Sequence, residues 1–119
     1  MHNFRELQIW QKSIKLVKEV YLCTAEFPSN EQYGLTSQIR RCSVSIPSNI
    51  AEGSSRKSNK DFHRFLRISI GSAFELETQL IIANELGLVN LEKLNALLEE
   101  LVEIQKMING FEKSLLNAT

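Results

Sequence analysis

The sequence predicts an all-α protein, an antiparallel up-down-up-down four-helix bundle that forms a single domain over residues 1–119. Apolar residues recur at steps of three and four through four long segments, the spacing that places them on one face of a helix. Only two prolines and five glycines interrupt the chain, and most of them lie between these segments. Connections of about three to seven residues between long helices make each helix antiparallel to the next.

The first helix is expected from about Glu6 to Glu26, and Pro28 ends it. Ser29 and Gln32 then have the spacing of a capping box, so a second helix is expected to begin there. Two neighbouring apolar stripes run along the first helix: Leu7, Trp10, Ile14, Val17 and Tyr21, and beside them Leu16, Val20, Cys23 and Phe27.

The second helix contains Pro47, whose ring and missing N–H disturb the preceding turn. The apolar pattern continues across this residue, which favours one helix kinked near Pro47 over two separate helices. Gly53 is expected to end the helix in a left-handed conformation. The apolar stripe consists of Leu35, Ile39, Cys42, Ile46 and Ile50.

The third helix is expected to begin after Ser58, which can cap it, with Asp61 near the positive end of the helix dipole. It extends to Leu86, and Gly87 closes it. The residues expected to face the core are Phe62, Leu66, Ile70, Ala73, Leu80 and Ala83.

Asn90 is the expected cap of the fourth helix, whose apolar residues alternate steps of three and four, the pattern of a left-handed bundle. This seam consists of Leu94, Leu97, Leu101, Ile104, Ile108, Phe111 and Leu115. The acidic residues expected on the other face are Glu99, Glu100, Glu103 and Glu112.

The third helix carries more apolar surface than one core stripe needs, and helices that are apolar on two sides are buried on two sides. The pattern fits a homo-oligomer interface and a broad core that takes in both faces equally well. The residues of this second face are Gly71, Phe74, Thr78 and Ile81.

The composition is that of an ordinary globular protein, with 43% hydrophobic and 24% charged residues. We expect a cytoplasmic protein with no membrane contact, because the N-terminus lacks the regions of a signal peptide and no apolar run of about 18 residues occurs. Cys23 and Cys42 occupy apolar helical positions, which favours free buried thiols over a disulfide.

A neutral total charge hides a strong asymmetry along the chain. Residues 40–67 hold seven basic and two acidic residues, whereas residues 75–119 hold three basic and eight acidic residues, so their net charges are +5 and −5. A basic segment is typical of a surface that binds polyanions, but a solvated face has the same composition. The seven candidate residues are Arg40, Arg41, Arg56, Lys57, Lys60, Arg64 and Arg67.

Arginine forks and serine hydroxyls suit phosphate oxygens, and no aromatic platform for base stacking accompanies them. Contact with RNA or DNA should therefore involve the backbone of the nucleic acid. Glu52 can neutralise Arg56 one helical turn away. Lys60, Arg64 and Arg67 share one helix face and are the least expected of the seven to pair internally.

The sequence holds no constellation of catalytic residues. His2 and His63 lack metal-ligand spacing, and we interpret His63 as a solvent-facing polar residue. Glu75 and Glu77 point about 200° apart on a helix, so they cannot act as an acid–base pair. We expect no enzyme, no cofactor, no metal and no small-molecule substrate.

A set of residues in the first two thirds of the chain has the identities and the order of a known family. These residues are Phe4, Leu7, Trp10, Phe27-Pro28, Glu31, Tyr33-Gly34-Leu35, Gln38, Arg40-Arg41, Ser45-Ile46, Asn49-Ile50-Ala51-Glu52-Gly53, Arg56 and Phe65-Leu66. Through them the chain resembles the bacterial 23S rRNA intervening-sequence protein family, small four-helix-bundle proteins often described as ribosomal-like. The resemblance implies a homo-oligomeric ring, with a pentamer favoured. It also implies kinship with the accessory variability protein of diversity-generating retroelements, which binds nucleic acid through a basic surface.

Two functions remain open at this point. The first is a non-enzymatic homo-oligomeric bundle that contacts RNA, another nucleic acid or a nucleoprotein through the basic surface of the second and third helices. The second is an oligomeric scaffold for protein interactions, in which the arginines are structural and pair with the acidic fourth helix or with another subunit.

Overall fold

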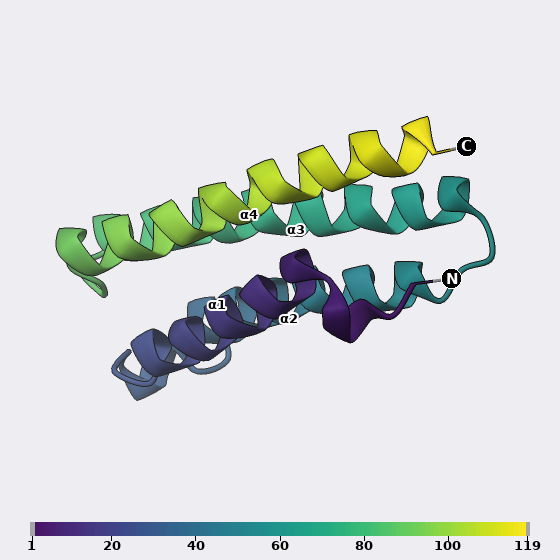
Figure 1. Ribbon diagram of the computed structural model, residues 1–119. Coiled ribbons are helices and arrows are strands. Elements are labelled where there is room, and N and C mark those ends of the chain that lie inside the picture. Colours follow the sequence, from purple (N-terminus) through teal and green to yellow (C-terminus); the bar gives the residue numbers. More distant parts are fainter. Residues whose placement is uncertain (1, 119) are drawn as a thin grey trace.

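Two helical hairpins make up the computed structural model, which describes residues 2–118. The first hairpin contains α1 (Gln8–Thr24) and α2 (Leu35–Ser54), and the second contains α3 (Asn59–Glu85) and α4 (Leu91–Asn117). Short 3₁₀ helices at Phe4–Glu6 and Ser29–Glu31 precede α1 and α2. Figure 1 shows both ends of the chain beside the turn that joins α2 to α3. The all-α four-helix bundle is the fold that the sequence predicted.

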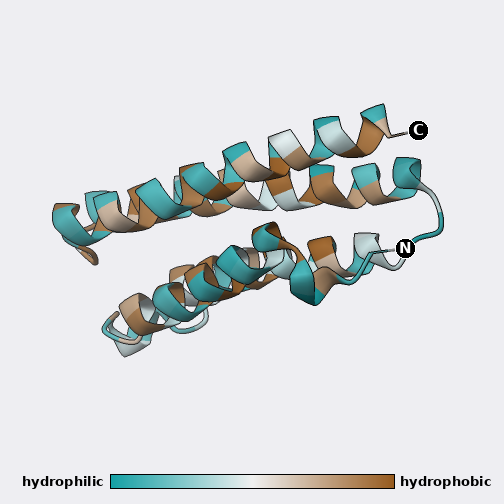
Figure 2. Cartoon of the chain, in the orientation of Figure 1, coloured by the Kyte–Doolittle hydropathy of each residue, from teal (hydrophilic) through white to brown (hydrophobic). Residues whose placement is uncertain are grey.

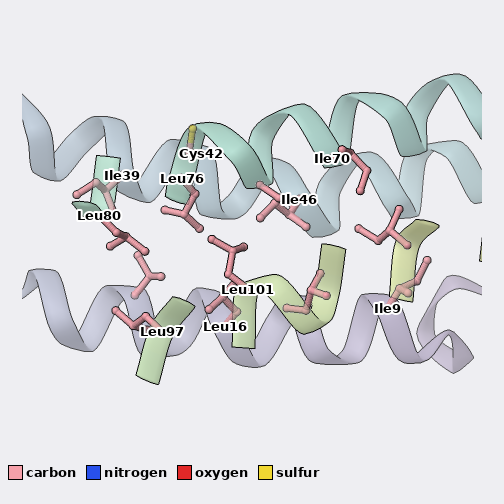
Figure 3. Packing of buried hydrophobic residues seen from close by; sticks show 14 of the residues in the cluster. Ile9, Leu16, Ile39, Cys42, Ile46, Ile70, Leu76, Leu80, Leu97 and Leu101 are labelled. Atoms are coloured by element: carbon pink, nitrogen blue, oxygen red, sulfur yellow. The ribbon is translucent and has the colours of Figure 1, made fainter. Parts of the chain in front are cut away.

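The core lies between the two hairpins and receives side chains from all four helices. Figure 3 shows Leu16, Leu76 and Leu101 pointing into the same space from α1, α3 and α4. Each is at most 1% exposed, and burying such a side chain contributes about 1.5–3 kcal/mol. The core faces predicted for α3 and α4 are confirmed, except that Phe111 is only partly buried.

The two apolar stripes of α1 have different surroundings. Leu16, Val20 and Cys23 lie in the core, whereas Ile14 and Tyr21 remain 43% and 41% exposed. Hydrophobic residues consequently appear on the outer surface of the α1–α2 hairpin as well as inside it (Figure 2).

Helix α2 continues through Pro47, as the unbroken apolar pattern predicted. Proline removes the N–H that would bond the Ser43 carbonyl, so the local helix depends more on its neighbour. Ser69 of α3 supplies one contact there, because its hydroxyl donates to the Ile46 carbonyl at 2.9 Å.

The capping box predicted at Ser29 is wrong. Residues Ser29–Glu31 form a 3₁₀ helix, in which the Gln32 N–H bonds the Ser29 backbone carbonyl at 3.1 Å instead of its hydroxyl. Helix α2 begins only at Leu35, whose N–H reaches the Glu31 carboxylate at 3.5 Å. The Gln32 N–H, which a capping box would bond to the Ser29 hydroxyl, is therefore already bonded to a backbone carbonyl.

Gly53 has a different role from the left-handed helix end that was predicted. Within residues 2–118 the one positive φ belongs to Gly87, at 77°, which closes α3 as expected. Gly53 instead allows α2 to approach α3, because an added Cβ would lie 2.7 Å from Phe65 Cβ and 2.8 Å from Phe62 Cδ1.

The starts of α3 and α4 agree with the predictions from the sequence. Ser58 caps α3 by accepting the Asp61 N–H at 3.1 Å, and Asn90 caps α4 by accepting the Lys93 N–H at 2.7 Å. Such caps typically contribute about 1 kcal/mol each. They confirm both predicted helix starts.

We expect Gly53→Ala to lower the free energy of unfolding by about 1–3 kcal/mol, because the new methyl group overpacks the contact between α2 and α3. Gly110→Ala is the matched control: it lies in α4, and apart from the adjacent backbone of α4 no atom lies within 4 Å of the position that its new methyl group would take. It should raise stability by about 0.5–1 kcal/mol, the usual gain for this exchange inside a helix. Urea unfolding measures both, and equal effects would contradict the close approach.

Candidate functional site

The seven candidate basic residues do not form one continuous surface. Arg40 and Arg41 lie in the first half of α2, whereas the other five lie at or after its C-terminus. Arg56 follows Arg40 by 16 positions, which corresponds to roughly 24 Å along the axis of an α-helix. The predicted surface therefore divides into separate sites, and their surroundings differ.

Arg40 is directed towards the end of α1. Its Nε donates to Thr24 Oγ1 at 2.8 Å, its Nη2 donates to the Tyr21 carbonyl at 3.3 Å, and its guanidinium carbon lies 4.5 Å from the Tyr21 ring centroid. Cations and donors at this position stabilise the carbonyl end of a helix. Arg40 is consequently a structural residue that holds α1 against α2.

Arg67 of α3 pairs with Glu112 of the neighbouring helix α4, which contradicts the predictions that Arg67 lacks an internal partner and that Glu112 lies on the outer face. Its Nη1 lies 3.1 Å from Glu112 Oε1, and Glu112 is buried instead of facing the solvent. The interpretation of His63 as a solvent-facing residue is wrong as well, because its Nδ1 is buried 2.9 Å from Glu112 Oε2, without forming a hydrogen bond. The reason is that a buried carboxylate needs charged or polar partners, and α3 provides both.

Arg56 and Arg64 make only exposed local pairs. Arg56 reaches Glu52 at 3.1 Å, as predicted, and its guanidinium carbon lies 4.6 Å from the Phe65 ring centroid. Arg64 reaches Asp61 at 3.3 Å, so it too has an internal partner that was not expected. Surface pairs of this kind contribute about 0–1 kcal/mol, so both arginines can exchange their partner for a ligand.

Lys57 lies in the connection before α3, Lys60 lies in the first turn of α3, and both are exposed to solvent. Among the residues that the structure describes, neither takes part in an ion pair or a side-chain hydrogen bond. Together with Arg56 and Arg64 they surround the connection between α2 and α3. We name these four residues the basic turn.

Arg41 belongs to a second site, a polar cleft between α2 and α3. The cleft has a volume of about 400 Å³. The Ser45 and Ser72 hydroxyls meet at 2.8 Å across it. We call this site the α2–α3 cleft, and its lining residues are Gln38, Arg41, Cys42, Ser45, Ser72, Glu75 and Gln79.

The thiol of Cys42 donates to Glu75 Oε2 at 3.1 Å within this cleft. Burial, followed by the bond to Glu75, raises the pKa of the Cys42 thiol to about 12. Glu77 faces the other way and accepts a bond from Gln105 of α4 at 3.0 Å, which confirms that the two glutamates point apart. Sequence reasoning missed the cleft, and the only signal was the occurrence of short hydroxyl side chains on both helices.

The second apolar face of α3 is exposed in this chain. Phe74 is 55% and Ile81 40% exposed, and Gly71 and Thr78 are exposed beside them. The core of one chain therefore does not take in both faces. A second apolar surface, to which one of the two predicted apolar stripes of α1 contributes, is a groove of about 290 Å³ between α1 and α2. Its lining includes Trp10, Ile14, Val17, Val44, Pro47 and Ala51.

Metal-ligating clusters and membrane-spanning helices are lacking among residues 2–118. Cys23 and Cys42 are free and buried, as predicted. No group of three His, Cys, Asp or Glu side chains in this part of the chain is placed to hold a metal ion. None of the helices described is sufficiently long and apolar to cross a membrane.

A pair of carboxyl groups connects α1 to α4. Glu19 faces Glu100, whose Oε2 is buried without a donor. Two ionised carboxylates can only accept hydrogen bonds, so they can bond each other only when one of them is protonated. The hydrogen bond with Glu19, followed by burial, therefore raises the pKa of Glu100 to about 7. Glu103 differs, because the Lys12 ammonium at 2.7 Å lowers its pKa.

Comparison with known proteins places these features in context. Residues 5–110 match the family described as 23S rRNA-intervening sequence protein. A solved structure of a protein with unknown function from the S23 ribosomal protein family of Bacteroides thetaiotaomicron is 25% identical, with a TM-score of 0.78. The alignment covers 88% of this chain and 98% of that one. No curated protein matches the chain significantly.

The Glu19–Glu100 pair predicts a pH-dependent stability. Because the pKa of Glu100 is higher in the folded chain than in the unfolded one, its neutral form stabilises the fold, and this contribution is lost as the pH rises through about 7. We expect Glu100→Gln to be more stable than the wild type near pH 8 and nearly equal to it at about pH 5. Urea unfolding at both pH values measures the difference.

Glu103→Gln is the matched control for this experiment. Its lowered pKa predicts the opposite sign, a loss of stability near neutral pH, because the substitution removes the charged partner of Lys12. A Glu100→Gln variant that loses stability near neutral pH would contradict the shared proton.

Proposed function

Since the chain belongs to the 23S rRNA-intervening sequence protein family, we propose that it is a non-enzymatic homo-oligomeric bundle that contacts the phosphate backbone of RNA, free or within a nucleoprotein, through the basic turn. The observation that carries this proposal is the presence of Lys57 and Lys60, two exposed lysines with no ion pair among the described residues, at one end of the bundle. Lysines of this kind neutralise phosphates and release counterions.

The electrostatics of the basic turn support phosphate binding. Four cationic side chains surround the turn, and only Glu52 and Asp61 oppose them, so the local net charge is +2. The N-terminus of α3 adds the positive end of its helix dipole to the same region. Both arginine partners are exposed, so a phosphate can replace either carboxylate at little cost.

A homo-oligomer is supported by two apolar surfaces that differ in shape and composition. The α3 face presents Phe74 and Ile81, whereas the α1–α2 surface is a groove. Unlike surfaces that complement one another form head-to-tail contacts, which close into a ring when the rotation between successive subunits allows closure. The resemblance to the family favours five subunits. The free thiols Cys23 and Cys42 support a reducing compartment, the cytoplasm.

The second candidate function, a scaffold for protein interactions, is favoured by a specific observation. Arg40 and Arg67 bind groups of the same chain, with Thr24 and Glu112 as partners. These two arginines are structural, as that hypothesis requires. The scaffold hypothesis does not explain the unpaired lysines of the basic turn, and for this reason we place it second.

For RNA binding, we expect Lys57→Gln/Lys60→Gln to weaken binding to every single-stranded RNA sequence about equally. Because each neutralised phosphate contributes about 0.7 to the salt dependence on single strands, losing two contacts should reduce the slope of log K against log salt by about 1.4. Fluorescence anisotropy over a range of salt concentrations measures both quantities.

Lys18→Gln/Lys106→Gln is the matched control, because these lysines are also exposed but lie on α1 and α4. The control should leave affinity nearly unchanged while removing the same total charge. Equal losses in both double variants would mean that net charge, and not the basic turn, determines binding. Absence of wild-type binding at low salt would favour the scaffold.

For assembly, we expect Phe74→Glu to dissociate the oligomer and leave the helical circular dichroism unchanged. The side chain is 55% exposed in the single chain, so a carboxylate there costs little until a second subunit covers it. Covering an unpaired charge costs several kcal/mol, enough to disrupt a subunit contact. Multi-angle light scattering gives the mass of each form.

Leu91→Glu is the control for the assembly experiment. Leu91 is 62% exposed at the start of α4, where an acidic residue suits the helix dipole, and it lies outside the α3 face. This variant should keep the wild-type mass. A monomeric wild type at micromolar concentration would refute the oligomer.

A further inference from the structure

The α2–α3 cleft contains opposite charges that do not neutralise each other. Arg41 and Glu75 both line it, yet no ion pair joins them among the described residues. Glu75 uses Oε2 to accept the Cys42 thiol, and its Oε1 has no hydrogen-bond partner in the same part of the chain. The cleft therefore offers a group of cationic donors and a separate anionic acceptor.

The floor of the cleft has one hydroxyl proton without an acceptor. Asn49 Nδ2 donates to Ser45 Oγ at 3.0 Å, and the Ser45 and Ser72 hydroxyls share a single bond at 2.8 Å. Whichever serine donates in that bond, the proton of the other has no acceptor within residues 2–118. Polar groups in such a cleft normally form hydrogen bonds, so this hydroxyl suits a polar ligand that accepts its proton.

These observations restrict the chemistry of the ligand. A phosphate chain would meet the Glu75 carboxylate, and a simple cation would meet the Arg41 guanidinium, so neither suits the cleft. A ligand with a carboxylate close to an ammonium group matches both charges at once. We propose that the α2–α3 cleft binds a small zwitterion of the α-amino-acid class.

In this arrangement the ligand carboxylate bonds Arg41 and the free serine hydroxyl, since a guanidinium presents paired donors to a carboxylate. The ligand ammonium bonds Glu75 Oε1, which the Cys42 thiol leaves free. Apart from Cys42, the residues that line the cleft are polar or charged, so no hydrophobic side chain selects the side chain of the ligand. The site should consequently recognise the two charged groups and tolerate many side chains.

The test is a heteronuclear NMR titration of the full-length protein with L-alanine at millimolar concentrations. We expect saturable shifts at the backbone amides of Ser45, Ser72 and Glu75. N-acetylalanine and alanine amide each lack one charge, and each should bind about tenfold or more weakly, as expected when a charge-assisted hydrogen bond is lost.

Arg41→Gln and Glu75→Gln should weaken alanine binding to the same extent, and Glu75→Gln keeps an oxygen for the Cys42 thiol. Lys60→Gln and Glu85→Gln are the matched controls, because they remove the same charges from outside the cleft and should not change alanine binding. Lys60→Gln also separates this site from the basic turn. The proposal is overturned if alanine causes no saturable shift, if the blocked analogues bind equally well, or if Arg41→Gln binds like the wild type.

Discussion

The close contact between α2 and α3 is the constraint on which the other features depend. Gly53 has no side chain at the point where α2 meets Phe62 and Phe65, so the two helices approach closely near their turn. Further along, Ser69 bonds the carbonyl beside Pro47. Small residues along this seam fix the separation of the two helices. That separation positions the basic turn at one end and allows two serine hydroxyls to meet across the cleft.

Most of the fold could be predicted because apolar periodicity is local information. The spacing of buried residues in α3 and α4 identifies the core without knowledge of partners, and the caps Ser58 and Asn90 lie next to the helices they start. Prediction failed where one residue type has two physical uses. Gly53 could serve a left-handed turn or a close approach, and only the position of α3 decides between them. The prediction of a capping box at Ser29 failed for a similar reason, because the Ser29 backbone carbonyl competes with the Ser29 hydroxyl for the same N–H.

The candidate sites were less predictable, because their partners lie far apart in the sequence. The pair between Arg56 and Glu52 could be predicted, since residues four apart face each other on a helix. Arg67 and Glu112 are 45 positions apart, and their contact depends on the register between α3 and α4. The same holds for the cleft, which draws its lining from two helices. A charge count over residues 40–67 therefore overstated the free basic surface, because it could not separate structural arginines from exposed lysines.

The bond from Cys42 to Glu75 has a consequence for the redox behaviour of the protein. Oxidants and alkylating reagents attack the thiolate, and a thiol with a pKa of about 12 is almost entirely protonated at neutral pH. Burial also raises the pKa of Cys23. Both thiols are thus protected by a raised pKa, and both side chains are largely buried. Thiol-specific labelling of the folded chain should be slow, and its rate would report on the opening of the helices.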